Sequence, residues 1–155
     1  MNFKSFFHEQ HSSISHQTFY HGSMNYLPIN TILTPKDDYE QNWSGTDFYN
    51  ILEMYRPKEM LAHKESVFMC DNPDDVDNAG GGTEYLFTVK PLGKIEKHDL
   101  NWGSEISMLL SDGHEFDSED IMNAAHNYWT GIPHTNESVW EYLTPKCIVL
   151  NVEQY

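Results

Sequence analysis

The sequence predicts a single α+β domain, and three observations support that fold class. The chain has 155 residues, a length that suits one domain. Aromatic residues make up 14% of it, which supplies a core that a disordered chain would lack. Segments with strand-type and helix-type patterns alternate, and strands predominate in the second half. We therefore expect an N-terminal arm over residues 1–16 and one domain over residues 17–155.

The first part of the chain carries one strand pattern, a long loop and one helix pattern. The sequence QTFY at 17–20 alternates like a short strand, whereas residues 24–45 are punctuated by proline and glycine and indicate mostly loop. A helix is predicted over 46–60, because Thr46 is a good N-cap and the apolar residues that follow have helical spacing. Pro57 is expected to end or kink this helix, because proline has no amide proton to donate.

Three strands and one short helix are predicted in the middle of the chain. Residues 66–70 (SVFMC) form an apolar run that is typical of a buried strand. Asn72 then offers a helix cap, and the short helix that follows must stop at the glycines of 80–82. Residues 83–91 have a strong strand pattern, and residues 94–100 have a weaker one.

Two helices and two strands complete the predicted domain. Residues 102–110 have helical periodicity, and residues 118–131 form the clearest helix, with a polar cap, a terminal glycine and one apolar stripe. The segments 139–143 and 146–155 have strand patterns, and Pro145 separates them.

The charge balance argues against a general nucleic-acid-binding role. The net charge is −15, from 24 acidic residues against 9 Lys and Arg. Affinity for phosphates rests on clustered basic side chains, which this chain lacks. The acids are spread along the chain among aromatic residues, which favours an ordinary solvated surface over a nucleic-acid mimic that fills a basic groove.

The two cysteines and the absence of targeting patterns favour a cytoplasmic protein, in the producing cell or in a host. Cys70 and Cys147 lie in apolar runs, so we expect buried thiols and no disulfide framework. The apolar stretch at the N-terminus is too short for a secretory signal. No run approaches the length of a membrane span, so no membrane partner is expected.

Directly after the first strand pattern, the chain continues with His21, Gly22 and Ser23. A histidine held at a strand end can face a backbone carbonyl with one ring nitrogen and donate to a ligand hydroxyl with the other. Gly22 lets a ligand approach the backbone, whose N–H and C=O can pair with an amide. The alternative is an ordinary turn with a polar tip, in which Ser23 caps the turn.

Two later strands carry side chains that are suited to contact the same ligand. Phe68 lies on the strand at 66–70, where it is either a core residue or a stacking platform for a ligand ring. Glu141 shares one face of the strand at 139–143 with apolar residues. Because a carboxylate is costly to bury without a partner, Glu141 lies either at a sheet edge or at a functional site.

These three segments, in this order, resemble motifs of the ADP-ribosyltransferase superfamily. FYHGS is similar to the first motif, a strand that ends in His-Gly-Ser or His-Gly-Thr. ESVFMCDNPDDV is similar to the second, an aromatic strand followed by a short helix, and VWEYL is similar to the third, a late strand with the catalytic acid. The resemblance spans roughly residues 17 to 152 and points to small bacterial and phage-type members with a His, aromatic and acid triad.

The resemblance implies two facing, mainly antiparallel sheets with flanking helices around an NAD cleft, and transfer of ADP-ribose from NAD. His21 would then bond the adenosine-side ribose, and the Gly22 backbone would hold the nicotinamide carboxamide. Phe68 would stack on the nicotinamide ring, with Ser66 as a second candidate contact. Glu141 would bond the 2′-hydroxyl of the nicotinamide ribose and stabilise the oxocarbenium-like state.

Four further residues bear on this reading. Phe68 stands where the family usually has Tyr, which retains stacking without the hydroxyl. Val139 stands where arginine-modifying members carry an acid or amide, which leaves the acceptor unidentified. Arg56, the only arginine, is a candidate contact for the NAD pyrophosphate, with a surface role or backbone N–H groups as alternatives. Ser23 is a weaker candidate contact for NAD.

Two other functions stay open on the sequence alone. One is a catalytically inactive binding or virion protein on the same fold, and the other is an acidic mimic that inhibits a nucleic-acid-binding protein. Size and motif style suggest a phage or mobile-element effector as the setting for the enzyme. His8, His11 and His16 have loose metal-like spacing, but they lie in the polar arm, and no metal site is expected.

Overall fold

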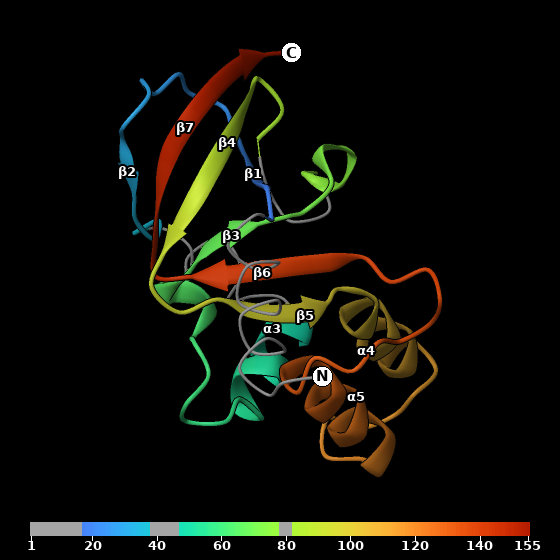
Figure 1. Cartoon of the computed structure of the whole chain (residues 1–155). Helices are drawn as coiled ribbons and strands as arrows, with labels where there is room; N and C mark the ends of the chain where they lie inside the picture. Colours follow the sequence, from blue (N-terminus) through green and yellow to red (C-terminus); the bar gives the residue numbers. More distant parts are fainter. Residues whose placement is uncertain (1–16, 38–46, 78–81) are drawn as a thin grey trace, which may run out of the picture.

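The computed structural model describes residues 17–37, 47–77 and 82–155. These residues form two antiparallel sheets and three α-helices, so the predicted α+β class is confirmed. In Figure 1 the four-stranded sheet rises above the three-stranded sheet, and the helices lie below both. The predicted N-terminal arm lies outside the described residues.

The four-stranded sheet has the order β1-β4-β7-β2. Its strands are β1 (Phe19–Ser23), β4 (Tyr85–Leu92), β7 (Lys146–Gln154) and β2 (Ile32–Leu33), and each neighbouring pair is antiparallel. The strand β2 was not predicted, because two residues are too few for a periodic pattern and the strand exists only through its pairing with β7.

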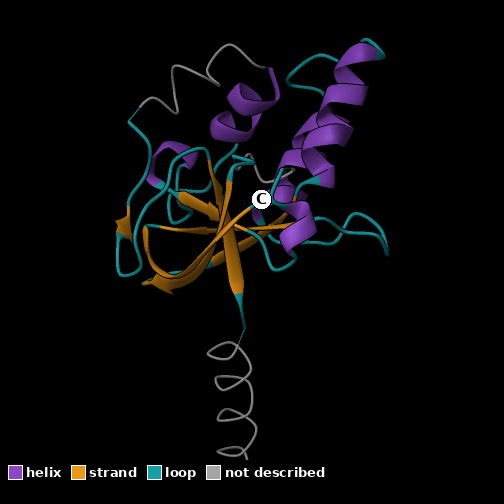
Figure 2. Cartoon of the chain, turned by 90° about the horizontal axis from the view of Figure 1, so that it is seen from above, coloured by secondary structure: helices purple, strands orange, loops and turns teal. Residues whose placement is uncertain are grey.

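The three-stranded sheet has the order β3-β6-β5, again with antiparallel pairs. Its strands are β3 (Val67–Met69), β6 (Trp140–Thr144) and β5 (Glu96–Asp99). Two short connections carry the chain between the sheets: Gly93, with a φ of 107°, follows β4, and Pro145 separates β6 from β7. The view from above shows strands of the two sheets crossing one another (Figure 2).

Three α-helices pack together on the far side of the three-stranded sheet. They are α3 (Asp47–Met54), α4 (Asn101–Ser111) and α5 (Glu119–Trp129), and α4 contacts both of the others. Two single turns of 3₁₀-helix, η1 (His63–Glu65) and η2 (Pro73–Asp75), precede and follow β3. The helices predicted at 46–60, 102–110 and 118–131 are therefore present, although α3 ends at Met54, before the proline.

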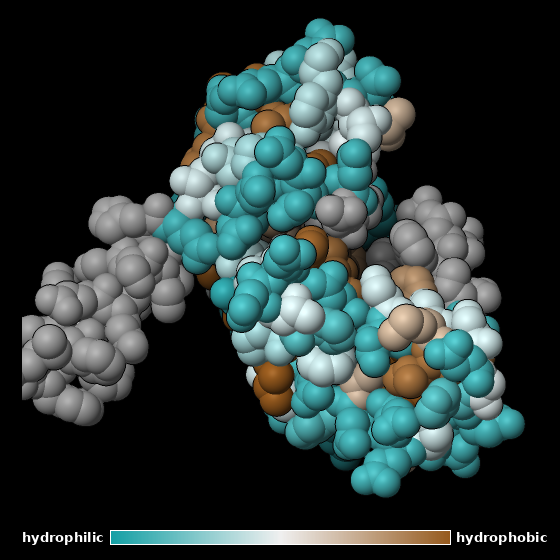
Figure 3. Space-filling view, turned by 90° about the vertical axis from the view of Figure 1, so that its right-hand side faces the viewer, coloured by the Kyte–Doolittle hydropathy of each residue, from teal (hydrophilic) through white to brown (hydrophobic). Residues whose placement is uncertain are grey.

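The core has two main parts, one between the two sheets and one among the helices. The cluster among the helices contains the predicted apolar stripe of α5, namely Ile121, Ala124, Ala125, Tyr128 and Trp129. The cluster between the sheets contains residues from strands of both sheets, among them Phe19, Met69, Phe87, Tyr142 and Val149. On the face shown in Figure 3, hydrophilic side chains cover most of the surface, and apolar atoms gather where the upper and lower parts meet.

Two predicted elements differ in extent from those observed. The first strand continues through His21 and Gly22 to Ser23, because all three residues pair with β4. The helix predicted after Asn72 is the single turn η2, in which the Asn72 side chain accepts a hydrogen bond from the amide of Asp74, 3.0 Å away. The predicted cap is confirmed, and His21 lies within a strand rather than in a turn after it.

Candidate active site

A cavity of about 1210 Å³ lies between the end of β1, the segment around β2, strands β3 and β6, and helices α3 and α4. Its volume exceeds the roughly 300–1,000 Å³ of drug-sized sites, so it has room for a dinucleotide. Five of the seven predicted site residues line it: His21, Ser23, Ser66, Phe68 and Glu141. Gly22 and Arg56 are not among the lining residues.

The strands β1 and β3 meet at one isolated antiparallel bridge between the two sheets. Tyr20 donates its amide to the carbonyl of Cys70 at 2.9 Å, and Cys70 donates to the carbonyl of Tyr20 at 3.0 Å. Continuing this register would place Gly22 opposite Phe68, but the pairing stops after one bridge. The pairing between the two strands therefore ends before Gly22, which is itself buried.

The main-chain groups of Gly22 face the open edge of β1. Those of Tyr20 point away from β4, because they bond Cys70 on the other side. In an antiparallel strand residues two apart direct their N–H and C=O to the same edge, so those of Gly22 also point away from β4. This orientation fits the expected contact with a carboxamide, although the Gly22 residue lies beyond the cavity lining.

His21 closes the gap between the strands with its side chain. The imidazole Nδ1 lies 2.7 Å from the carbonyl oxygen of Phe68, and it must be the donor because a carbonyl can only accept. Burial lowers the pKa of His21 below its usual value, so the ring is neutral at pH 7 and Nε2 carries a lone pair. This corrects the expectation that the second ring nitrogen donates: in this tautomer it accepts from a ligand hydroxyl.

The two serines at the cavity wall make hydrogen bonds within the protein. The hydroxyl of Ser23 donates to the carbonyl of Asn25 at 2.8 Å and accepts from the Asn25 amide at 3.0 Å, which is the turn cap considered from the sequence. The hydroxyl of Ser66 donates to the carbonyl of Ala62 at 2.8 Å. Their protons are therefore engaged, and either hydroxyl would meet a ligand as an acceptor.

Strand register places Phe68 and Glu141 on the same face of the three-stranded sheet. Phe68 pairs with Leu143, and Glu141 lies two residues before Leu143 on β6. Glu141 is directly opposite His98 of β5, which therefore shares this face. Both Phe68 and Glu141 line the cavity, together with Val139.

Glu141 is deeply buried and has one protein partner. The side chain is 4% exposed, and its Oε1 accepts a hydrogen bond of 2.5 Å from the hydroxyl of Tyr128. Burial raises the pKa of Glu141 to about 7, and the bond from Tyr128 opposes that rise. Among the described residues no side chain or amide bonds the second carboxylate oxygen, Oε2, which leaves it available to a ligand in the cavity.

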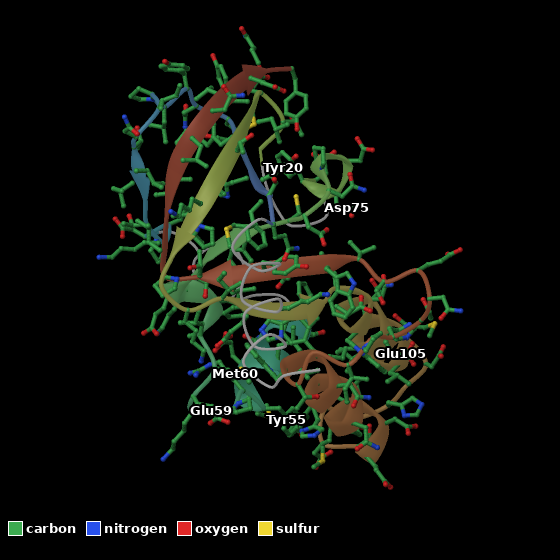
Figure 4. All side chains as sticks on the ribbon, in the orientation of Figure 1. Tyr20, Tyr55, Glu59, Met60, Asp75 and Glu105 are labelled. Carbon is green, nitrogen blue, oxygen red and sulfur yellow. The ribbon has the colours of Figure 1, made fainter. Side chains whose placement is uncertain are left out.

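Arg56 lies away from the cavity and holds the loop between α3 and η1. Its Nε pairs with Glu53 at 3.1 Å, and its Nη1 donates to the carbonyl of Met60 at 2.8 Å. The other oxygen of Glu53 accepts from the amide of His63 at 3.0 Å. Figure 4 shows Met60 on the helical side of the three-stranded sheet, whereas Tyr20 lies on the opposite side with β1. Arg56 thus contacts the loop rather than a cleft.

Three residues of the site were not predicted from the sequence. Tyr128 was assigned to the apolar stripe of its helix, yet a buried tyrosine needs a partner for its hydroxyl, and that requirement was the available signal. His63 lies in no recognisable motif. Lys36 lines the cavity, and its charge is one of the influences that lower the pKa of His21, so it provides a cation close to the site.

Helix α4 presents a polar face to the cavity. Asn101, Ser104 and Ser107 all line it, at spacings of three residues along one side of the helix. Together with Lys36 they add polar groups to a wall that also includes apolar and aromatic residues of α3 and β3. These groups could bond phosphate or ribose oxygens.

No protein-family model matches this chain, and no curated protein matches it. In the described parts of the chain, no helix is both long and apolar enough to cross a membrane. Within residues 17–37, 47–77 and 82–155, no three His, Cys, Asp or Glu side chains come together as a metal site. The histidines of the predicted N-terminal arm lie outside these ranges.

Proposed function

We propose that this protein is a mono-ADP-ribosyltransferase that uses NAD as its donor substrate. The observation that supports this most directly is the convergence of His21, Phe68 and Glu141, from three distant segments, on one cavity. A solvent-facing Glu141, or one remote from His21, would have contradicted the enzyme. The acceptor stays unidentified, and the glycohydrolase reaction, in which water is the acceptor, is the nearest alternative outcome.

Each group has a chemical role in this proposal. The ring of Phe68 stacks on nicotinamide, and the N–H and C=O of Gly22, which point away from β4, pair with its carboxamide. Nε2 of neutral His21 accepts from a ribose hydroxyl. Lys36 and the serines of α4, rather than Arg56, face the pyrophosphate. In this assignment Arg56, the candidate phosphate contact named from the sequence, has no role at the pyrophosphate.

Glu141 is the catalytic residue of the proposal. Its free oxygen accepts from the 2′-hydroxyl of the nicotinamide ribose, and its negative charge stabilises the positive charge that develops on the ribose. The C1′–N bond breaks with its electron pair leaving on nicotinamide, and the acceptor nucleophile then forms a bond to C1′ and loses a proton. Because only the carboxylate form stabilises this cation, activity requires a pH near or above 7.

A labelled-NAD assay with cell lysate tests the proposal. Wild-type protein is expected to transfer label to an acceptor or to release nicotinamide, and Glu141→Gln is expected to reduce either rate at least a hundredfold. Glu153→Gln is the matched control, because Glu153 is exposed on β7 and does not line the cavity. Label transfer that persists in Glu141→Gln would contradict the mechanism. NAD binding without turnover would instead favour the inactive binding protein.

A further inference from the structure

A short chain of hydrogen bonds links Glu141, Tyr128 and His63, which all line the cavity. The Tyr128 hydroxyl lies 2.5 Å from Oε1 of Glu141 and 2.8 Å from Nε2 of His63. The three residues come from β6, α5 and η1, so tertiary packing alone brings them together. All three are buried, with exposed fractions of 4%, 1% and 3% for Glu141, Tyr128 and His63.

The packing around Tyr128 allows its ring little freedom. The ring stacks on His98 with 4.6 Å between centroids, and it meets His63 edge-on at 5.8 Å. His98 donates from Nδ1 to the main-chain carbonyl of Tyr128 at 2.8 Å, which also fixes this turn of α5. The position of the hydroxyl is therefore set by two histidines and a helix, independently of any ligand.

The direction of the hydrogen bonds follows from the Glu141 carboxylate, which can only accept, and from the single ring proton of a neutral His63. Burial lowers the pKa of His63 to about 3, so the ring is neutral at pH 7 and carries one proton. With that proton on Nε2, His63 donates to the oxygen of Tyr128, and the tyrosine proton is directed to Oε1 of Glu141. Oε1 is then occupied, and among the described residues Oε2 has no protein donor.

We propose that Tyr128 is a positioning residue that binds Oε1 of Glu141 and so presents Oε2 to the substrate, with His63 keeping the Tyr128 hydroxyl in the donor orientation. This inference rests on the proposed transferase function for its effect on catalysis. The contact itself concerns the protein alone and can be tested without NAD. In this chain the aromatic residue of the second motif, Phe68, has no hydroxyl, whereas Tyr128 brings one to the acid from α5.

Among the ionisable groups around the cavity, Glu141 is the one that we expect to change charge near neutral pH. The groups that face it come from every element packed around it: Tyr128 of α5, His63 of η1, His98 of β5 with its partner Glu96, and across the cavity His21 and Lys36. Burial lowers the pKa of all three histidines, although the bonds of His98 to Tyr128 and Glu96 oppose that lowering, and His21 and His63 are neutral at pH 7. A donor bond to the carboxylate lowers the pKa of Glu141, and removing that donor must raise it.

The experiment compares wild type with Tyr128→Phe, which removes the hydroxyl and keeps the ring. In the variant we expect the acid limb of the pH profile of kcat/KM to move at least one pH unit upward. At pH 7 we expect kcat to fall at least tenfold with little change in KM. Tyr142→Phe is the matched control: Tyr142 is the next residue on β6, its hydroxyl bonds Asp71 and Gln17, and its acid limb should not move.

The pKa of the Glu141 carboxyl is measured in parallel by NMR on carbon-13-labelled protein without NAD. A pKa raised in Tyr128→Phe and unchanged in Tyr142→Phe supports the positioning contact, even if wild type proves inactive on NAD and the proposed function fails. An unchanged pKa, or an equal loss of kcat at every pH, overturns it. If Tyr128→Phe does not fold, 3-fluorotyrosine at position 128 is the substitute, because its more acidic hydroxyl should lower the pKa of Glu141 and move the acid limb downward.

Discussion

Glu141 combines deep burial with one oxygen open to the cavity, and this combination sets its protonation. The carboxylate loses hydration on folding and gains a single strong donor, Tyr128. The loss of hydration is the larger effect, so the pKa of Glu141 is raised to about 7 from 4.5. A structural acid would have been paired or exposed, whereas this one is arranged to change charge near neutral pH.

The same burial makes stability depend on pH. Because the pKa of Glu141 is higher in the folded state, its contribution is complete below pH 4.5 and is lost as the pH rises through 7. The free energy of unfolding of wild type, minus that of Glu141→Gln, should fall by about 3 kcal/mol between pH 4 and pH 9. Urea denaturation of both proteins across this range measures it. A difference that stays constant with pH would show that Glu141 is not desolvated as the structure indicates.

At the scale of elements, the site depends on how strands end. The strand β1 extends through Ser23 because β4 continues to pair with it, whereas the pairing of β1 on its other side stops after the single bridge between Tyr20 and Cys70. At that point the side chain of His21 donates a hydrogen bond to the carbonyl of Phe68. A second bridge, between Gly22 and Phe68, would have engaged the main-chain groups of Gly22 that the proposed carboxamide contact needs.

The loop between α3 and η1 is held in place by the side chain of Arg56. Arg56, the chain's single arginine, is a candidate phosphate contact from the sequence, but its half-buried guanidinium bonds Glu53 and two carbonyls of the loop. Glu53 in turn bonds the amide of His63. Arg56 therefore supports the first residue of η1, and through it the hydrogen bonds that reach Glu141.

We expect Arg56→Gln to lower the stability of the protein and Lys36→Gln to weaken its binding of NAD. Arg56→Gln removes a partly buried ion pair and charged hydrogen bonds, so it should lower the free energy of unfolding by about 1 to 2 kcal/mol without a direct loss of NAD contact. Lys36→Gln should leave stability unchanged and weaken NAD binding several-fold, because Lys36 lines the cavity. Thermal unfolding and calorimetric titration with NAD distinguish the two. The reverse pattern would restore Arg56 as the phosphate contact.

At the scale of the whole molecule, two sheets and a helical layer are joined into one unit around the cavity. The chain crosses between the sheets at Gly93 and Pro145, and the backbone bridge between Tyr20 and Cys70 joins them again near the site. The two main core clusters lie on opposite faces of the three-stranded sheet. The cavity is therefore formed by the assembly of all these layers rather than by one element.

This arrangement predicts cooperative unfolding. Because β6 and β7 are separated by one residue and each belongs to a different sheet, neither sheet can unfold without disturbing the other. Thermal transitions measured by far-ultraviolet and near-ultraviolet circular dichroism should coincide. The near-ultraviolet signal includes Trp129 and Trp140, which pack at the three-stranded sheet. Two separated transitions would contradict a single domain over residues 17–155.

The local patterns of the sequence determined most of the elements and three of the positions at the site. Apolar spacing predicted the helices, the Asn72 cap predicted where η2 begins, and the strand patterns located His21, Phe68 and Glu141. These features are readable because each depends on residues within a few positions of one another. The family resemblance and the activity that it implies remain a proposal, for which the shared cavity is support.

Only the tertiary structure decided which groups meet. The strand β2 exists through a partner more than a hundred residues away, and Tyr128 reaches Glu141 because α5 packs on the three-stranded sheet. Likewise, Arg56 bonds carbonyls of its own loop. The neutral state of His21 follows from burial, which no local pattern encodes. Hydrogen bonds and desolvation depend on distance in space, so the protonation of Glu141 and the direction of its open oxygen follow from packing.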